Sequence, residues 1–393
     1  MKRSLVLSAA LTAALSAGGY KIPESSINAT ALSAAYVANS HGADAAYYNP
    51  AAMVYNDNAN FLEVDATYIG LSPIDFSDGY GSKKESFLVP TLHYSSKKLG
   101  ENGGRVGLSI VAPSGLSKRW DNPAAKASAK EFTLKTIEVN PSVAIPLSET
   151  VSMGVGFRMV RTEGVVKSDA APVPVSRDMS GDAADYGYNM AVNYRPQSNV
   201  SLAATYRSKI NLNIDGNADL NFLGNLYSGS TSVTVPMPAA LSLAAAYTFE
   251  SGTTVEAVYE RTYWSAYKQL DFNYGGTPNP ATAYFGATLN KNWKNTNTYR
   301  LGVTQKIDQW TAMAGVAYDE TPVPETSLGY ELPDADAFMV SLGGRYQMDE
   351  HWDIGFGSLI DMKKDRTVHN GSIDGEFSNA RAYLVTCGIE YRF

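Results

Sequence analysis

The chain has 393 residues, of which 44% are hydrophobic and 18% charged, with a formal net charge of −7 and a single cysteine, Cys387. The acidic balance excludes a general nucleic-acid binder, and a lone cysteine excludes an internal disulfide. No apolar run of about 18 residues follows the N-terminal region, which excludes a helical membrane protein.

Residues 1–18 have the order of a secretory signal peptide. Lys2 and Arg3 precede an apolar run from Leu5 to Leu15, and small residues follow. The run is too short to span a bilayer, so we expect the segment to be cleaved during export. Loss of the two basic residues brings the mature chain to about −9.

Residues 19–58 are Ala-rich and contain the stretch "HGADAAYYNPAAM", in which Asn49, Pro50 and Ala51 follow one another. Few large apolar side chains are available for a separate core, and Pro50 stops a helix from continuing through it. The segment can therefore be a free periplasmic tail or a plug inside a barrel.

Residues 59–393 alternate between apolar and small or polar side chains, as in Val151, Met153 and Val155 against Ser152 and Gly154. Period 2 is sustained here for longer than in ordinary globular strands. The alternation predicts fourteen strands, at 60–70, 86–95, 104–112, 131–147, 151–164, 183–195, 199–210, 239–250, 253–263, 297–306, 309–320, 336–348, 351–362 and 380–393.

The connections between these strands alternate between short and long. This layout is typical of bacterial outer-membrane barrels, with short periplasmic turns and long external loops. A secreted β-sandwich is the soluble alternative, but it has no reason to sort its loops in this way. We therefore predict an all-β fold, a 14-stranded antiparallel transmembrane β-barrel, with the N-terminal segment as a candidate plug.

The C-terminal strand ends in alternating aromatic residues, including Tyr391 and Phe393. This ending resembles the signature that the outer-membrane barrel assembly machinery reads. We expect that machinery to be a partner, together with outer-membrane lipid and lipopolysaccharide.

Several stretches, in order along the chain, resemble the FadL-type family of outer-membrane transporters for long-chain fatty acids and other hydrophobic compounds. They include "GGYKIPESSINATALSAAYVANSHGADAAYYNPAAM", "GLSIVAPSGLSKRW", "IEVNPSVAIPLSETVSMGVGFR", "NYRPQSNVSLAATYRSKI", "VYERTYWSAY" and "VAYDETPVPETSLGYELPDADAFMVSLGGRY". The resemblance implies that residues 19–58 are a hatch inside the barrel of residues 59–393. It also implies a kinked third strand that opens the wall sideways, and Gly103, Gly104 and Gly107 could permit the kink.

Arginines on the inner face of the barrel are candidates for binding a carboxylate head group, because a guanidinium can hold both oxygens. Alternation places Arg158, Arg207, Arg300 and Arg345 on that face, where each could equally belong to a structural ladder of charges. Arg158 is the first choice, since the resembling family carries a basic ligand contact in this region. Arg161 is also a candidate, because the alignment with the family can shift by a few residues in this region.

The predicted function is passive uptake of long-chain fatty acids or other hydrophobic small molecules across the outer membrane. A general diffusion porin and a surface adhesin or structural barrel are the alternatives. We expect no enzyme activity, no cofactor, no metal site and a monomer. A group of residues in or beside the long loops could form an external apolar groove: Tyr227, Met237, Trp264, Tyr267, Tyr284, Phe285 and Trp293.

Overall fold

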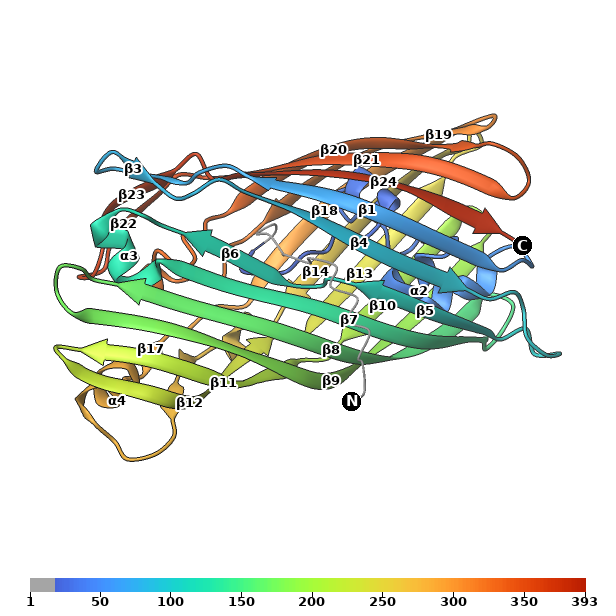
Figure 1. The fold of residues 1–393 in the computed structure, drawn as a ribbon. Coiled ribbons are helices and arrows are strands. Elements are labelled where there is room, and N and C mark those ends of the chain that lie inside the picture. The colour runs from blue at the N-terminus through green and yellow to red at the C-terminus, as the bar shows by residue number, and fades with distance from the viewer. Residues whose placement is uncertain (1–17) are drawn as a thin grey trace.

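The computed structural model describes residues 18–393, so the predicted signal peptide lies outside the described residues except for Gly18. The described chain forms a closed antiparallel β-barrel with 14 strand positions (Figure 1), which confirms the predicted fold class. Three of these positions consist of two consecutive segments. The wall strands are β1 (Phe61–Leu71), β4 (Glu85–Ser95), β5 (Arg105–Val111) with β6 (Gly115–Arg119), β7 (Glu131–Pro146), β8 (Val151–Asp169), β9 (Val175–Gln197), β10 (Val200–Arg207) with β11 (Ile210–Phe222), β12 (Asn225–Met237) with β13 (Ala240–Thr248), β14 (Thr253–Thr262), β18 (Thr296–Ile307), β19 (Trp310–Asp319), β20 (Ala337–Gln347), β21 (Trp352–Lys363) and β24 (Arg381–Arg392).

The barrel closes between its first and last strands. β1 pairs with β24 from Phe61 opposite Arg392 to Leu71 opposite Ala382. Beyond the strand, the backbone N–H of Phe393 donates to the carbonyl of Asn60 at 3.0 Å. Closure leaves neither end of the sheet as an open edge.

Two segments predicted as loops, 165–182 and 211–238, are mostly strands. Along β9 the outward side chains are Tyr186, Tyr188 and Met190 in one part, and Asp178 and Asp182 nearer the long-loop end. The apolar outward face of the membrane-spanning part thus gives way to a polar one, and the barrel wall continues into water. The prediction was wrong at these positions because it looked for apolar outward faces.

The two ends of the barrel differ, as predicted. Short turns join the strands at one end, and longer connections with extra elements join them at the other (Figure 1). Within residues 18–393, no helix is both long and apolar enough to cross a membrane. The extra elements are β2 (Asp75–Phe76), β3 (Tyr80–Gly81), α3 (Pro123–Ala129), a 3₁₀ turn (Trp264–Ala266), β15 (Gln269–Leu270), β16 (Phe272–Tyr274), α4 (Pro280–Phe285), β17 (Leu289–Asn290), a 3₁₀ turn (Glu325–Ser327), β22 (Arg366–His369) and β23 (Asp374–Ser378).

Residues 18–58, called the hatch from here on, lie inside the barrel toward the short-turn end, dark blue in Figure 1. The hatch contains α1 (Ile27–Ala31), α2 (Ala45–Tyr48) and the 3₁₀ helix η1 (Pro50–Tyr55), which includes Pro50 and Ala51. α1 packs on β20, β21 and β24, whereas η1 packs on β7, β8 and β9. The segment is therefore a plug and not a free tail.

Small residues on both sides let the hatch pack against the wall. A Cβ added to Gly315 would lie 2.2 Å from the backbone of Leu32, and one added to Gly154 would lie 2.5 Å from the Ala51 nitrogen. Asn49, fully buried, donates from its side chain to the carbonyl of Val37 at 2.9 Å. The alanines and glycines of the sequence thus allow a backbone-to-wall contact that larger side chains would block.

The third strand position is interrupted at residues 112–114, between β5 and β6, where the sequence has Pro113. This break does not coincide with the glycines proposed for it. Gly103 lies in the preceding turn with φ of +66°, and Gly104 forms a bridge with Leu99. Gly107 instead gives room to the hatch, because an added Cβ would lie 2.7 Å from Ala46.

Deleting Phe393 is expected to lower the yield of closed barrel, because it removes both the Asn60 pairing and the stacking of Phe393 on Tyr391 at 5.4 Å. The measurement is the fraction of unboiled protein that migrates differently from boiled protein on a gel. Phe393→Tyr keeps the ring and should assemble like the wild type. Equal yields for the deletion and the wild type would contradict the role of Phe393.

Candidate functional site

Two cavities lie one behind the other inside the barrel. The first, called the outer pocket, lies in the half with long loops and contains about 820 Å³ of space free of atoms, including its open mouth. Its walls come from β6 to β9, β11 and β12, and from the loops that carry Tyr267, Trp293 and Leu332. Most of the lining side chains are apolar, and Lys291 and Glu331 are the charged ones among them.

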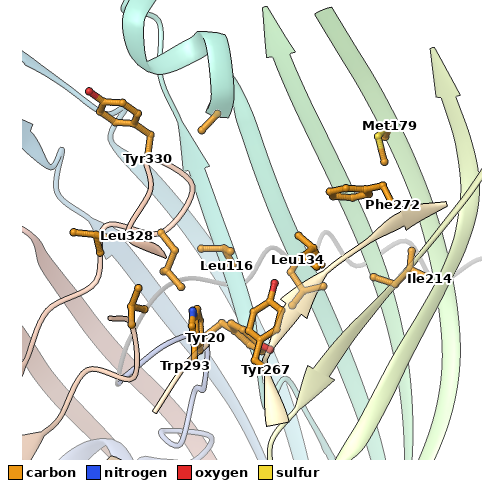
Figure 2. Close-up of a cluster of buried hydrophobic side chains, with 14 of the residues drawn as sticks. Tyr20, Leu116, Leu134, Met179, Ile214, Tyr267, Phe272, Trp293, Leu328 and Tyr330 are labelled. Atoms are coloured by element: carbon orange, nitrogen blue, oxygen red, sulfur yellow. The ribbon is translucent and has the colours of Figure 1, made fainter. Parts of the chain in front are cut away.

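Aromatic side chains dominate one side of the outer pocket. Tyr20 of the hatch packs edge-on against Trp264, with ring centroids 4.7 Å apart, and Trp293 lies 5.0 Å from Trp264 and 4.8 Å from Tyr267. Of the residues predicted to form an external groove, Tyr267 and Trp293 line this pocket and Trp264 packs against them, whereas Tyr284 is 53% exposed. Figure 2 shows two groups, Tyr20, Tyr267 and Trp293 on one side and Met179, Ile214 and Phe272 on the other.

The second cavity, called the inner pocket, lies between the hatch and the wall and contains about 780 Å³ of space free of atoms, including its openings. Tyr20 lines the outer pocket and its neighbour Lys21 lines the inner one, so the first hatch residues separate the two. The Tyr20 hydroxyl donates to the carbonyl of Pro236, which lies between Val235 of the outer pocket and Met237 of the inner pocket.

The inner pocket brings together three of the predicted arginines, Arg158, Arg207 and Arg300. Arg158 is tightly held: it donates to Glu138 from Nε at 3.0 Å and from Nη2 at 2.9 Å, and to the carbonyl of Ser208 at 2.7 Å. Arg207 pairs with the same Glu138 and lies over the Tyr47 ring at 4.3 Å.

Arg300 has the weakest contacts of the three. Its guanidinium lies 3.4 Å from Glu260 and 3.5 Å from the carbonyl of Ser33, although its side chain is only 2% exposed. Glu260 is held more closely by Lys21, at 2.6 Å. Arg300 is therefore the inner-pocket arginine with the most hydrogen-bonding capacity left for another group.

The other two arginines lie elsewhere. Arg161 points away from the lumen, with 69% of its side chain exposed and Asp182 3.6 Å away. Arg345 contacts the hatch at Asn28, 2.7 Å away, and pairs with Glu63. Neither lines the outer or the inner pocket.

Lys21 is the inner-pocket residue that sequence reasoning missed. It is the sole lysine or arginine in the predicted hatch, and that isolation was the available signal. Its ammonium group donates to Glu260 and to Thr262, the latter at 3.2 Å. Lys21 thereby ties the hatch to β14 inside the pocket.

The hatch also joins the broken third strand. The N–H of Ile22 donates to the carbonyl of Pro113 at 2.9 Å, and the N–H of Gly115 donates to the carbonyl of Tyr20 at 2.8 Å. On the other side of the break, β4 pairs with β5 only from Leu92 to Ser95. Within the described residues, the next backbone bond between these strand positions joins Lys83 to Arg119 at 2.9 Å. Residues 86–91 therefore border a gap in the hydrogen-bonded wall.

Two carboxylates of the wall bind backbone N–H groups in the middle of the hatch. Glu256 of β14 accepts hydrogen bonds from the three backbone N–H groups of residues 37–39, at 2.7, 2.6 and 3.1 Å. Glu390 of β24 accepts one from Ala43 at 2.9 Å. Hydrogen bonds such as these can be exchanged for bonds to water or to a ligand, so they hold the hatch in place and still allow it to move.

The family model described as "Outer membrane protein transport protein (OMPP1/FadL/TodX)" matches residues 8–393. The long-chain fatty acid transport protein of Escherichia coli O157:H7 is 25% identical, over 86% of this chain and 84% of that protein. A FadL homologue from Pseudomonas aeruginosa has the same fold, with a TM-score of 0.80 at 20% identity, over 95% and 99% of the two chains. The toluene transporter TbuX of Ralstonia pickettii gives a TM-score of 0.71 at 17% identity, over 93% and 97%.

Arg158→Met is expected to destabilise the barrel more than Arg300→Met. The first change leaves fully buried Glu138 with one cation in place of two, and breaking a buried ion pair costs up to about 3–5 kcal/mol. The second leaves Glu260 paired with Lys21. Urea unfolding of the two variants in lipid vesicles measures the difference, and equal losses would show that Arg300 is as structural as Arg158.

Proposed function

Because the chain belongs to the outer membrane transport protein family OMPP1/FadL/TodX, we propose that it carries long-chain fatty acids or other hydrophobic compounds across the bacterial outer membrane. The observation that carries the proposal is the series of two pockets, separated by Tyr20 and Lys21 and ending at the broken third strand. Proteins named for transport of long-chain fatty acids and of toluene are among the similar ones.

The outer pocket suits capture of an apolar molecule. Burying one methylene group gains about 0.8 kcal/mol, so a long acyl chain gains on the order of 10 kcal/mol in a dry pocket. Binding of that strength needs a second step that weakens the site. A shift of the hatch, which contributes Tyr20 to the outer pocket and Lys21 to the inner one, supplies such a step.

The inner pocket suits an anionic head group. Its lining has four basic residues, Lys21, Arg158, Arg207 and Arg300, and one carboxylate, Glu260. Behind the lining, Glu138 pairs with Arg158 and Arg207, and the buried carboxylates of Glu24 and Asp319 interact with the charge of Arg300. The cationic groups of this lining, next to apolar side chains of the hatch and wall, suit the carboxylate and the acyl chain of a fatty acid. Arg300 is the residue we assign to its carboxylate. Arg158 is the alternative, although its donors are largely occupied by Glu138 and Ser208.

Release is proposed to occur sideways, through the gap beside residues 86–91 of β4. The inner pocket reaches Pro113 and Ser114 at the break, where the hatch is paired with the wall. Withdrawal of residues 20–22 would remove that pairing and open a path from the pocket to the gap. A hydrophobic ligand would then leave into the membrane and avoid the water-filled periplasm.

A general diffusion porin fits the molecule less well. Porins keep an aqueous channel open, whereas here the hatch fills the lumen with buried residues such as Ile27, Leu32 and Met53. A structural barrel or adhesin would have no use for two pockets in series. Transport of a hydrophobic compound uses each of these features.

Arg300→Ala is expected to weaken binding of a long-chain fatty acid by about 10- to 150-fold, because a hydrogen bond to a charged group is worth about 1.5–3 kcal/mol. The alcohol of equal length should lose little affinity. Equilibrium binding of labelled acid and alcohol to protein in lipid nanodiscs measures both. Equal losses for the two ligands would mean that Arg300 supports the pocket and does not read the head group.

Locking the hatch to the wall is expected to stop uptake. The hydroxyls of Ser33 and Ser341 lie 2.8 Å apart, so cysteines at both positions, in a Cys387→Ala background, should form a disulfide. Uptake of labelled fatty acid into cells should fall on oxidation and recover with a reductant. Ser33→Cys alone is the control. Undiminished uptake by fully cross-linked protein would show that this part of the hatch stays in place during transport.

A further inference from the structure

Two buried polar atoms of the outer pocket have no hydrogen-bond partner among the described residues, the Thr231 hydroxyl oxygen and the indole nitrogen of Trp293. Trp293 is 5% exposed, and its indole N–H has no hydrogen-bond partner among the described residues. Its ring lies among the aromatic side chains of the pocket (Figure 2), 5.7 Å from the Tyr20 ring and 4.8 Å from the Tyr267 ring. A buried donor without a partner costs about 1–3 kcal/mol, which a ligand with an acceptor atom would recover.

The two charged residues that line the outer pocket pair with each other, and a further cation, Arg177, lies behind the wall, 5.1 Å from the centre of the Phe272 ring. Lys291 and Glu331 both line the pocket, and the Lys291 ammonium lies 2.6 Å from a Glu331 oxygen. Ser327 also binds the Lys291 carbonyl at 2.6 Å, which fixes the segment that carries the lysine. Neither charge is left over for a ligand.

This ion pair persists over a wide range of pH. Burial by itself would lower the pKa of Lys291, but the charge of Glu331 raises it overall. Burial by itself would raise the pKa of Glu331, but Lys291 lowers it overall. Both groups therefore stay charged around neutral pH, and a ligand carboxylate beside Lys291 would also face the negative charge of Glu331.

We propose that, among the hydrophobic compounds it admits, the outer pocket binds best those that carry an uncharged hydrogen-bond acceptor oxygen, such as esters and ketones, and that the indole N–H of Trp293 donates to that oxygen. The inference rests on the proposed transport function and names the class of compound that the outer pocket prefers. An unsubstituted hydrocarbon fills the same space but leaves the indole N–H unpaired. The carboxylate of a fatty acid finds Lys291, the cation in the lining of this pocket, already paired, and finds Arg300 only in the inner pocket.

The test compares two uncharged probes of similar size, methyl decanoate and undecane, in wild type and in Trp293→Phe. Phenylalanine keeps a six-membered aromatic ring and removes the five-membered ring that carries the N–H donor. A neutral hydrogen bond is worth about 0.5–1.5 kcal/mol, so the variant should lose about 2- to 13-fold more affinity for the ester than for the hydrocarbon. Trp310→Phe, which changes an exposed tryptophan at the short-turn end, is the matched control and should affect neither probe.

A second readout locates the hydrogen bond. The carbonyl stretch of ¹³C-labelled methyl decanoate should move to lower wavenumber on binding to wild type and to Trp310→Phe, but not on binding to Trp293→Phe. Wild-type affinity for the ester should stay constant from about pH 6 to 8, because the ion pair keeps its charges.

The outcomes separate the inference from the function on which it rests. If Trp293→Phe weakens both probes equally and leaves the carbonyl band unchanged, the selection is overturned while uptake of hydrophobic compounds still stands. Tighter binding of decanoate than of its methyl ester, lost in Lys291→Met, would show that the pocket reads carboxylates and would also overturn the inference. If wild type binds neither the ester nor undecane, the transport function itself fails.

Discussion

The central constraint of this molecule is that an irregular backbone is buried in the lumen of a β-barrel. The wall strands satisfy their own N–H and carbonyl groups, whereas the hatch has only short helices, bonds partly within itself and needs partners in the wall for the polar atoms that remain. Glu256 of β14 accepts hydrogen bonds from the backbone N–H groups of residues 37–39, and Glu390 of β24 accepts one from the N–H of Ala43. The hatch is thus held by hydrogen bonds from the wall and by close contact with glycines, more than by a hydrophobic core of its own.

This mode of attachment connects the hatch to both pockets. Residues 20–22 are at once the partition between the outer and inner pockets and the partner of the broken third strand at Pro113. A ligand that changes the contacts of Lys21 or Tyr20 therefore acts on the strand break as well. In the proposed mechanism, three consecutive residues couple binding to opening, so no long relay through the wall is needed.

Much of the fold could be predicted from the sequence, because a transmembrane wall imposes an outward apolar face at every second residue. The prediction was wrong where the wall leaves the membrane, as at Asp178 and Asp182, since that rule no longer applies there. Pro113 was a readable sign of the strand break, because proline is tolerated in sheets mainly at edges and interruptions. The pairing of Arg158 and Arg207 with Glu138 was not readable, because it depends on which residues lie across from one another on adjacent strands.

The continuation of β9, β11 and β12 beyond the apolar band also bears on how such proteins diverge. Several residues that line the outer pocket, among them Met179, Ile214 and Val233, lie on strands whose outward side chains there include Asp178, Asn213 and Asp215. Substitutions in this region carry no cost for lipid contact, and the strands that do contact lipid need not change with them. Substrate range can therefore change during evolution separately from membrane insertion, because the two properties depend on different parts of the same strands.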